Sequence, residues 1–489
     1  MRLRRVLVAA ALAGLPLAAA GTAVATPMPP GPADATVPSF IGHATVDKPV
    51  SSFPIPANPF MAPPGVNSMH NDAYATDAYK GGGPLGKNLQ VTTATYGVVE
   101  CATVTFDSRG RIVALCGGLQ GFQLMLIDPK TLDAIATMTT STRDATSGAN
   151  PLTDLCGGAY FYLDNHDRAI VETVQGTVLV VQVTKTGFTQ EKSYDVTPAI
   201  PKGDCLIALM PDWGGRIWFV TKGGGVGTIA PDTGKIQSLR LDGEAIVNSF
   251  ATDETGGVYI VSDHAMYRFD AGAHGQPVVT WRQVYDRGSQ QKPGQLSQGS
   301  GTTPTLIGKD LVVITDNADP RMHVIAYQRG KKVSGPRTVC SVPVFGANQG
   351  DTENSVDAVG RSVVVENNYG YKNPSSTMFG QTTTPGVARV GVGAKNCGLM
   401  WNSDVVAPTS VPKVSLKSGL AYVYSKPANV PQDAWYFTAL DLRSGKTVWQ
   451  KLTGTGTEYN NHYAAIYLGP DRSAYIATLS GFIRLHDAP

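Results

Sequence analysis

The amino-acid sequence predicts an all-β protein, a β-propeller of about eight four-stranded blades. From about Leu89 onward, short runs of β-branched residues alternate with turns rich in Gly, Asp and Asn, and no stretch has convincing helical periodicity. The runs also recur in a fixed order, in eight units that average about 49 residues from Ala102 to Pro489. Repeats of about 40–50 residues with four strands each are the signature of a propeller.

The first unit shows the pattern that the others repeat. Its expected strands cover residues 102–106, 111–115, 124–128 and 134–138. Comparable units start near Gly158, Cys205, Val247, Thr303, Ser355, Val414 and Tyr463. Their second strands are expected at residues 168–171, 216–219, 257–260, 310–313, 361–364, 419–422 and 472–475. The ring therefore has eight blades, or seven if one unit has been divided wrongly.

The last unit, Tyr463 to Leu485, has only three expected strands. The segment Leu89 to Val98 could supply the fourth strand and close the ring. Closure of this kind stabilises a propeller because it removes both free sheet edges.

The N-terminus has the composition of a signal peptide, assigned to residues 1–25. A basic start, Met1-Arg2-Leu3-Arg4-Arg5, precedes the small and apolar residues 6–20, and Ala23-Val24-Ala25 supplies the pattern that signal peptidase needs. The apolar run is shorter than the roughly 20 residues of a stable membrane span. We therefore expect a secreted or periplasmic protein without a membrane span.

A Pro-rich leader, residues 26–88, lies between the signal peptide and the propeller domain, residues 89–489. The leader lacks apolar periodicity, and its composition is typical of an extended chain. We expect it to lie over the surface of the body or to be partly disordered. Its His70-Asn71-Asp72 could cover the channel or have no role.

The charge balance argues against nucleic acid as a partner. Only 16% of the residues are charged, and the formal net charge is +2. Three Arg and no acidic residue lie in the first 25 residues, so the rest of the chain is close to neutral. A body this neutral has no electrostatic reason to bind nucleic acid or an anionic membrane surface. We expect a monomer.

Six Cys follow the signal peptide, at positions 101, 116, 156, 205, 340 and 397. An even number in an exported chain predicts disulfides, with 15 connectivities possible in principle. Cys101 and Cys116 flank a turn that could bring them together, and the other sequence-nearest pairs would join neighbouring repeats. We therefore predict pairing between sequence neighbours.

The segment from Ala439 to Trp449 carries the strongest motif of the chain. Its Ala439-Leu440-Asp441-Leu442-Arg443-Ser444-Gly445 followed by Trp449 resembles the A-x-D-x-x-(T/S)-G-x-x-x-W repeat of quinoprotein alcohol dehydrogenase-like propellers. In such a repeat, the Asp and Gly shape the turn between the third and fourth strands, and the Trp packs between blades. The resemblance covers most of the chain as architecture.

The resemblance also implies cofactors to consider. Dehydrogenases of this kind use pyrroloquinoline quinone and calcium, and typically place a vicinal disulfide against the quinone ring. This chain has no adjacent Cys pair and no unambiguous match to their catalytic Asp and calcium ligands. These departures argue against pyrroloquinoline quinone as a cofactor.

Candidate site residues follow from the way in which a propeller is built. The loops that enter each first strand and those that join second to third strands converge on one mouth of the central channel. On adjacent units these loops carry Asp316-Asn317, Glu353-Asn354 and Glu366-Asn367, and His462 lies in the last entry loop. We name Glu353, Glu366, His462 and Asp316 as candidate catalytic residues.

Calcium is the metal that this set of residues would suit. Carboxylates and amide carbonyls are hard oxygen ligands, which favour calcium over softer metals. The candidate ligands are Asp316, Asn317, Glu353, Asn354, Glu366 and Asn367. Each could instead simply cap a turn, because Asn and Asp are favoured turn residues.

Two classes of function fit these observations. The first is an exported enzyme, either a quinoprotein-like oxidoreductase or a metal-assisted hydrolase or lyase, acting on a small molecule or a sugar at the channel mouth. The second is a non-enzymatic propeller that binds a ligand or a protein. The clustered carboxyl and amide groups favour the first, whereas the absence of a recognised catalytic motif favours the second.

Overall fold

The computed structural model describes residues 25–97, 99–143, 154, 156–158, 160–428, 430 and 432–489. The predicted signal peptide lies outside these residues except for Ala25. Within them no helix is long and apolar enough to cross a membrane. The helical segments of the described chain are four short 3-10 turns, η1 (Asp34–Thr36), η2 (Thr197–Ala199), η3 (Pro374–Thr377) and η4 (Thr457–Tyr459).

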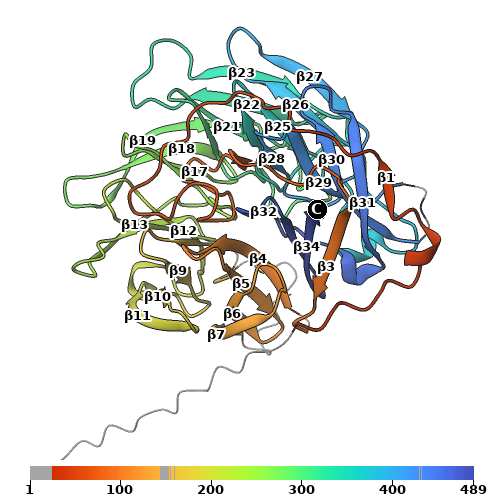
Figure 1. Ribbon diagram of the computed structural model, residues 1–489. Helices are drawn as coiled ribbons and strands as arrows, with labels where there is room; N and C mark the ends of the chain where they lie inside the picture. The colour runs from red at the N-terminus through yellow and green to blue at the C-terminus, as the bar shows by residue number, and fades with distance from the viewer. Residues whose placement is uncertain are drawn as a thin grey trace, which may run out of the picture.

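The predicted propeller is confirmed, and it has eight blades arranged in a ring (Figure 1). Each blade is an antiparallel meander, because short β-branched runs separated by tight turns pair with their sequence neighbours. The first four blades comprise β4 (Val99–Phe106), β5 (Ile112–Gly118), β6 (Gly121–Ile127) and β7 (Ala134–Thr142); β8 (Phe161–Leu163), β9 (Arg168–Glu172), β10 (Thr177–Val183) and β11 (Phe188–Asp195); β12 (Leu206–Pro211), β13 (Ile217–Thr221), β14 (Gly225–Ile229) and β15 (Ile236–Arg240); and β16 (Ala251–Thr252), β17 (Val258–Val261), β18 (Ala265–Ala271) and β19 (Pro277–Val284).

The other four blades continue the same order around the ring. They comprise β20 (Thr305–Ile307), β21 (Leu311–Thr315), β22 (His323–Gln328) and β23 (Thr338–Pro343); β24 (Asp357–Val359), β25 (Ser362–Glu366), β26 (Val387–Gly391) and β27 (Gly398–Ser403); β28 (Lys413–Ser415), β29 (Leu420–Ser425), β30 (Ala434–Asp441) and β31 (Thr447–Thr455); and β32 (Ile466–Leu468), β33 (Ala474–Thr478) and β34 (Gly481–Asp487) with β3 (Leu89–Ala94). The seventh blade is widened at its two edges by β1 (Phe40–Gly42) and β2 (Ala78–Tyr79).

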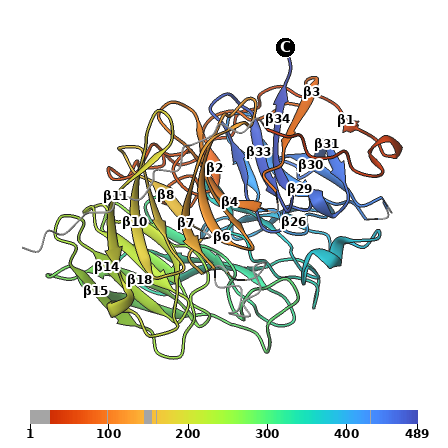
Figure 2. The ribbon, with the colours of Figure 1, turned by 90° about the horizontal axis from the view of Figure 1, so that it is seen from below.

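Ring closure follows the prediction. Strand β3 pairs antiparallel with β34, from Leu89 opposite Asp487 to Ala94 opposite Phe482, and the two strands lie side by side in Figure 2. The N-terminal part of the domain thus completes the last blade, and no blade is left with three strands.

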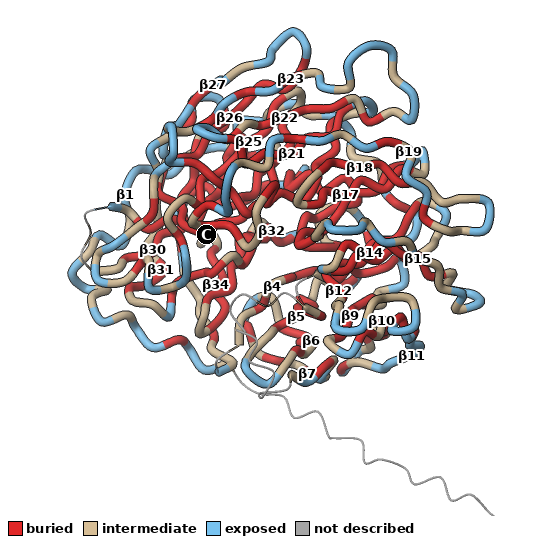
Figure 3. The backbone as a smooth tube through the Cα atoms, turned by 180° about the vertical axis from the view of Figure 1, so that it is seen from behind, coloured by how far each residue is buried: buried red, intermediate tan, exposed pale blue. Residues whose placement is uncertain are grey.

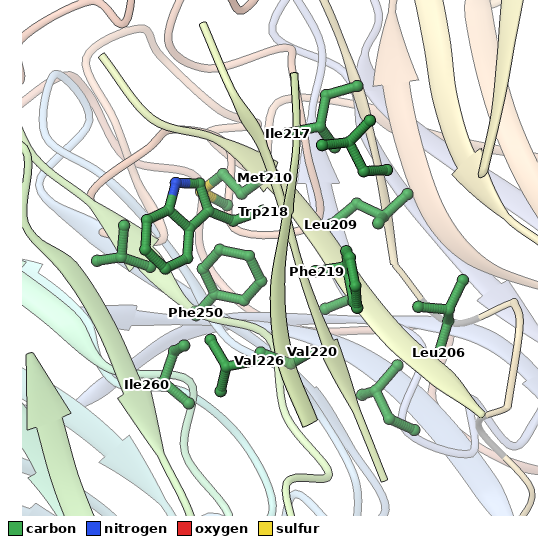
Figure 4. Packing of buried hydrophobic residues seen from close by; sticks show 14 of the residues in the cluster. Leu206, Leu209, Met210, Ile217, Trp218, Phe219, Val220, Val226, Phe250 and Ile260 are labelled. Carbon is green, nitrogen blue, oxygen red and sulfur yellow. The ribbon is translucent and has the colours of Figure 1, made fainter. Parts of the chain in front are cut away.

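Apolar side chains between blades form the core. In the cluster of Figure 4, Trp218 and Phe219 of β13 are fully buried, and they pack in one group with Phe250 and with Ile260 of β17 in the next blade. Figure 3 shows the same distribution for the whole ring, with buried residues inside and exposed residues along the outer loops. Burial of this kind contributes about 25 cal/mol per Å² of apolar surface.

All three predicted disulfides are present. Cys101–Cys116 joins β4 to β5, Cys156–Cys205 joins the entries of the second and third blades, and Cys340–Cys397 joins the fifth and sixth blades. Disulfides between blades stabilise the ring chiefly by restricting the unfolded chain.

The repeat motif in the seventh blade has the predicted structural role. The Asp441 carboxylate accepts hydrogen bonds from the backbone N–H groups of Arg443 and Ser444, and Gly445 has a φ of +70°. Trp449 is fully buried in a cluster shared with the eighth blade.

The sequence predicted a leader that lies over the surface of the body or is partly disordered. Part of the leader is instead buried. Residues 61–79, which we call the channel segment, are mostly buried. The backbone N–H groups of the innermost strands donate to its carbonyls; the donors include Phe106, Leu163, Thr252, Leu306, Ala358 and Val414, from six blades. A propeller leaves the inner edge of every first strand unpaired, and the channel segment accepts hydrogen bonds from this edge in six of the eight blades.

Candidate active site

A cavity of about 390 Å³ lies among the loops of the ring, against the channel segment. Its walls come from the loops that enter the first strands and the turns between second and third strands, the two loop sets singled out in the sequence. Met69 and His70 of the channel segment also line it, as do Glu100, Phe122, Arg143, Tyr160, Asn248, Leu296, Thr303, Glu353, Asn354, Ser355, Val411, His462, Tyr463 and Leu479. A cavity of this size suits a small organic molecule.

His70 is held in a fixed orientation in the cavity wall. Its Nδ1 lies 3.0 Å from Oδ2 of Asp77 and 3.0 Å from Oγ of Ser355. The ring is 4% exposed, and its Nε2 has no hydrogen-bond partner in the described structure. A buried polar atom without a partner costs free energy, so His70 retains an unused bonding position at the site.

Asp77 is the residue that orients His70. Burial opposes ionisation of its carboxyl, but the ammonium group of Lys413 and the ring of His70 outweigh burial and lower the pKa of Asp77. Lys413 is fully buried, forms an ion pair with Asp77 and donates to the carbonyl of Met69 at 2.8 Å. The Oγ of Ser355 also donates to Asp77, at 2.5 Å. Lys413, from the seventh blade, thus keeps the Asp77 carboxyl of the channel segment ionised.

Glu353 lines the same cavity in a different electrostatic environment. Its Oε2 accepts the backbone N–H of Leu296 at 3.1 Å, whereas its Oε1 has no partner in the described structure. The side chain is 8% exposed. Burial raises the pKa of Glu353 to about 8, only partly offset by the Leu296 hydrogen bond. This carboxyl therefore carries its proton near neutral pH.

The raised pKa of Glu353 makes stability depend on pH. The pKa rises from an ordinary 4.5 to about 8 on folding, so this stabilising contribution is complete below the unfolded-state pKa and is lost as the pH rises through the folded-state pKa. We expect the melting temperature to fall between about pH 5 and about pH 8.5. Glu353→Gln should reduce the fall in a calorimetric pH series, whereas Glu458→Gln, at an exposed carboxyl, should not. A fall of unchanged size in Glu353→Gln would contradict the assignment.

Two of the other predicted residues lie beside Glu353. Asn354 lines the cavity, and its amide donates to Oε2 of Glu366 at 2.9 Å. The amide of Asn368 donates to Oε1 of Glu366 at 2.6 Å. Burial raises the pKa of Glu366 well above its ordinary value. Glu366 thus lies behind the cavity wall, bonded through both carboxyl oxygens.

Asp316, Asn317 and Asn367 are not among the residues that line the cavity. Asp316 accepts the backbone N–H of His323 and lies 2.9 Å from its Nδ1. Asn317 and Asn367 each donate two side-chain hydrogen bonds to loop carbonyls, those of Arg287 and Gln290 and those of Gln349 and Pro385 respectively. The structure therefore brings Glu353, Asn354, Glu366 and His462 to one side of the mouth and places these three in loop contacts.

His462 lines the cavity with Tyr463. Its Nδ1 lies 2.9 Å from the hydroxyl of Tyr371. His462 and Tyr463 both have left-handed backbone conformations, with φ of +39° and +69° respectively. In the channel segment Ala75 and Asp77 share this feature, with φ of +52° and +53°. Such conformations cost of order 1–3 kcal/mol each and cluster at functional sites.

Calcium stays a prediction at this site. In the described part of the chain, no group of three or more His, Cys, Asp and Glu side chains is arranged to hold a metal ion. An ion held by Glu353, Asn354 and Glu366 would displace the amide hydrogen bonds on Glu366. For pyrroloquinoline quinone, the three disulfides join residues 15, 49 and 57 positions apart, so the vicinal disulfide of the dehydrogenases has no counterpart.

Sequence reasoning did not single out Asp77, Lys413, Glu100 or Tyr160. It noted His70 only as a residue that could cover the channel. The only sign of Asp77 in the sequence was its position, seven residues after His70 in a Pro-poor stretch of the leader. Lys413 carried none, because it lies 336 positions from Asp77.

Comparison with known proteins supports the architecture. No family model matches the chain. An uncharacterized protein of Archaeoglobus fulgidus is 29% identical over 326 residues, a match that covers 60% of this chain and 63% of that protein. The chain thus matches less than two thirds of that relative's length.

Two solved structures share the fold. The quinohemoprotein alcohol dehydrogenase of Comamonas testosteroni superposes with a TM-score of 0.53 and 11% identity, covering 87% of this chain and 80% of that chain. The quinohemoprotein alcohol dehydrogenase ADHIIG of Pseudomonas putida HK5 gives 0.56 and 12%, covering 86% and 80%. At these identities the likeness shows the β-propeller fold and nothing finer.

Proposed function

We propose that the protein is an exported hydrolase or lyase that acts on a small organic molecule by general acid–base catalysis in the cavity. One observation carries this proposal: the cavity wall contains His70 and Glu353, each nine-tenths or more buried, and each with one polar atom that has no partner in the described structure. Pairs of titratable groups whose environments differ in this way are typical of acid–base sites.

His70 is the proposed base. An ionised Asp77 carboxylate can only accept hydrogen bonds, so Nδ1 of a neutral His70 carries the proton and Nε2 presents a lone pair. A base placed in this way contributes typically about 10²–10⁴-fold to a rate. His70 would take a proton either from the substrate or from an attacking water molecule.

Glu353 is the proposed acid. It keeps its proton at neutral pH because burial raises its pKa to about 8. Protonated, it can donate from the oxygen that has no partner to the oxygen atom of a leaving group. Hydrolysis and elimination both need this pair of transfers, one proton removed and one delivered.

Export is part of the proposal. Three disulfides in the described structure suit an oxidising compartment outside the cytosol. Residues 1–25 would direct the chain there. Mass analysis of the mature protein from a secreting host tests this, since cleavage before Thr26 is expected.

A pH–rate profile tests the catalytic proposal. With a panel of 4-nitrophenyl esters, 4-nitrophenyl glycosides and lactones, we expect turnover of at least one class and a kcat/KM that falls above about pH 8 as Glu353 ionises. Glu353→Gln should lack this basic limb as well as most of the activity, whereas Glu458→Gln should keep both. A wild-type profile that stays flat from about pH 7 to pH 9.5 would contradict the role of Glu353.

A further inference from the structure

The carboxyl groups around the cavity outnumber the cations that could neutralise them. None of the following five is in an ion pair in the described structure: Glu100, Asp351, Glu353, Asp357 and Glu366. Of the nearby cations, Arg143 lines the cavity but is paired with Asp154, Lys413 is bound to Asp77, and Lys292 is paired with Asp319. Of these five carboxyls, Glu100 and Glu353 line the cavity, and neither is compensated by an ion pair to a described side chain.

Several of these carboxyl oxygens also lack hydrogen bonds. Oε1 of Glu353 and both oxygens of Asp351 have no partner in the described structure, although Asp351 is 1% exposed. Burial raises the pKa of Asp351 and that of Glu100 well above their ordinary values. Unpaired, unbonded buried carboxyls are costly, and a ligand that supplies positive charge would relieve that cost.

Glu100 is the most available of the five. It lies on β4 and lines the cavity directly. Its carboxyl makes no hydrogen bond or ion pair to any residue that the structure describes. Because Glu100 is only partly buried, a ligand can reach it without displacing an existing partner.

The other walls of the cavity suit an apolar body attached to a positive charge. Phe122, Tyr160 and Tyr463 present aromatic rings, and Leu296 and Val411 add aliphatic surface. Aromatic faces attract cations, with about 0.5–2 kcal/mol per contact. An anion in the cavity would meet the carboxyls of Glu100 and Glu353. The guanidinium of Arg143, which also lines the cavity, is already engaged, because it lies 4.6 Å from the Phe122 ring centroid and donates to the carbonyl of Asp154.

We infer that the substrate of this cavity is a small organic cation, an amine with an apolar or aromatic body, whose ammonium group binds Glu100. This inference rests on the proposed function and adds the substrate class: Glu100 binds the charged end, while His70 and Glu353 act on the remainder of the molecule. A metal ion is a poorer match because calcium needs six to eight oxygen ligands, whereas much of this wall is apolar.

Binding of three probes of similar size tests the inference. By isothermal titration calorimetry at about pH 7, benzylamine should bind at least about tenfold more tightly than benzyl alcohol, and benzoate should bind most weakly. Glu100→Gln should lower the affinity for benzylamine by about tenfold or more and leave that for benzyl alcohol unchanged. Glu458→Gln, the matched change at an exposed site, should alter neither.

The selectivity of the wild-type protein keeps the test valid even if Glu100→Gln fails to fold. Equal affinities for benzylamine and benzyl alcohol would overturn the inference, as would displacement of benzylamine by an equal concentration of calcium chloride. His70→Gln should still prefer benzylamine while losing turnover. Loss of probe selectivity with turnover intact would therefore refute the substrate class alone, and turnover that survives His70→Gln would refute the proposed function.

Discussion

His70→Gln is expected to lower kcat by about 10²–10⁴-fold on any substrate that the wild-type protein turns over. Gln preserves much of the size of the side chain and can still accept a hydrogen bond, but it cannot take up a proton at neutral pH. The fold should be retained, because the Gln amide can donate to Asp77 in place of Nδ1, and the Nε2 position of His70 has no partner to lose. Initial-rate kinetics, with the melting temperature measured alongside, check this result.

His166→Gln is the matched control for that experiment. His166 is exposed in the turn between β8 and β9, away from the residues that line the cavity, and its replacement should leave kcat unchanged. A folded His70→Gln protein with wild-type kcat would overturn the assignment of the base. His462→Gln belongs in the same series, because His462 lines the cavity and was predicted from the sequence as catalytic.

The Lys413→Met substitution is expected to destabilise the protein by about 3–5 kcal/mol. Lys413 is fully buried, and its ammonium group is the partner that keeps Asp77 ionised inside the channel. Without it, the Asp77 carboxylate would be buried without a compensating cation and would have to take up a proton. Equilibrium unfolding in urea measures the loss.

The double variant Asp77→Asn/Lys413→Met separates the charge from the packing. Removing both charges should recover part of the lost stability, because the uncompensated charge is then absent. Lys446→Met, at an exposed turn, should change stability by no more than about 0.5 kcal/mol. Equal losses in the single and double variants would contradict the electrostatic explanation. Activity should stay low in the double variant, since His70 loses its carboxylate partner.

Much of the fold could be predicted because its signals are local. Strand periodicity, turn residues and the order of the repeats all lie within about 50 residues of each other. The disulfide Cys101–Cys116 closes a hairpin, and the closing strand was identified from the three-stranded last unit. The prediction of the leader failed at the channel segment, because a Pro-rich composition reports an extended chain and does not say what the chain lies against.

The candidate site was predictable only in part. Glu353, Asn354 and His462 lie in loops that the propeller geometry itself directs to the mouth, so the repeat register was enough to find them. Asp316 occurs in an equivalent loop, yet its carboxylate is held by His323. Which carboxyl faces the cavity depends on side-chain partners that repeat spacing does not contain.

The sequence alone predicted a ring of about eight blades, its closing strand and disulfides between sequence neighbours, because each of these follows from short-range patterns along the chain. Only the tertiary structure decided that the channel segment pairs with the innermost strands and delivers His70 to the cavity. The contacts that fix His70 join it and Asp77 to Ser355 and Lys413, 285 and 336 positions away. Interactions over such separations arise when the blades assemble, and no local pattern of residues encodes them.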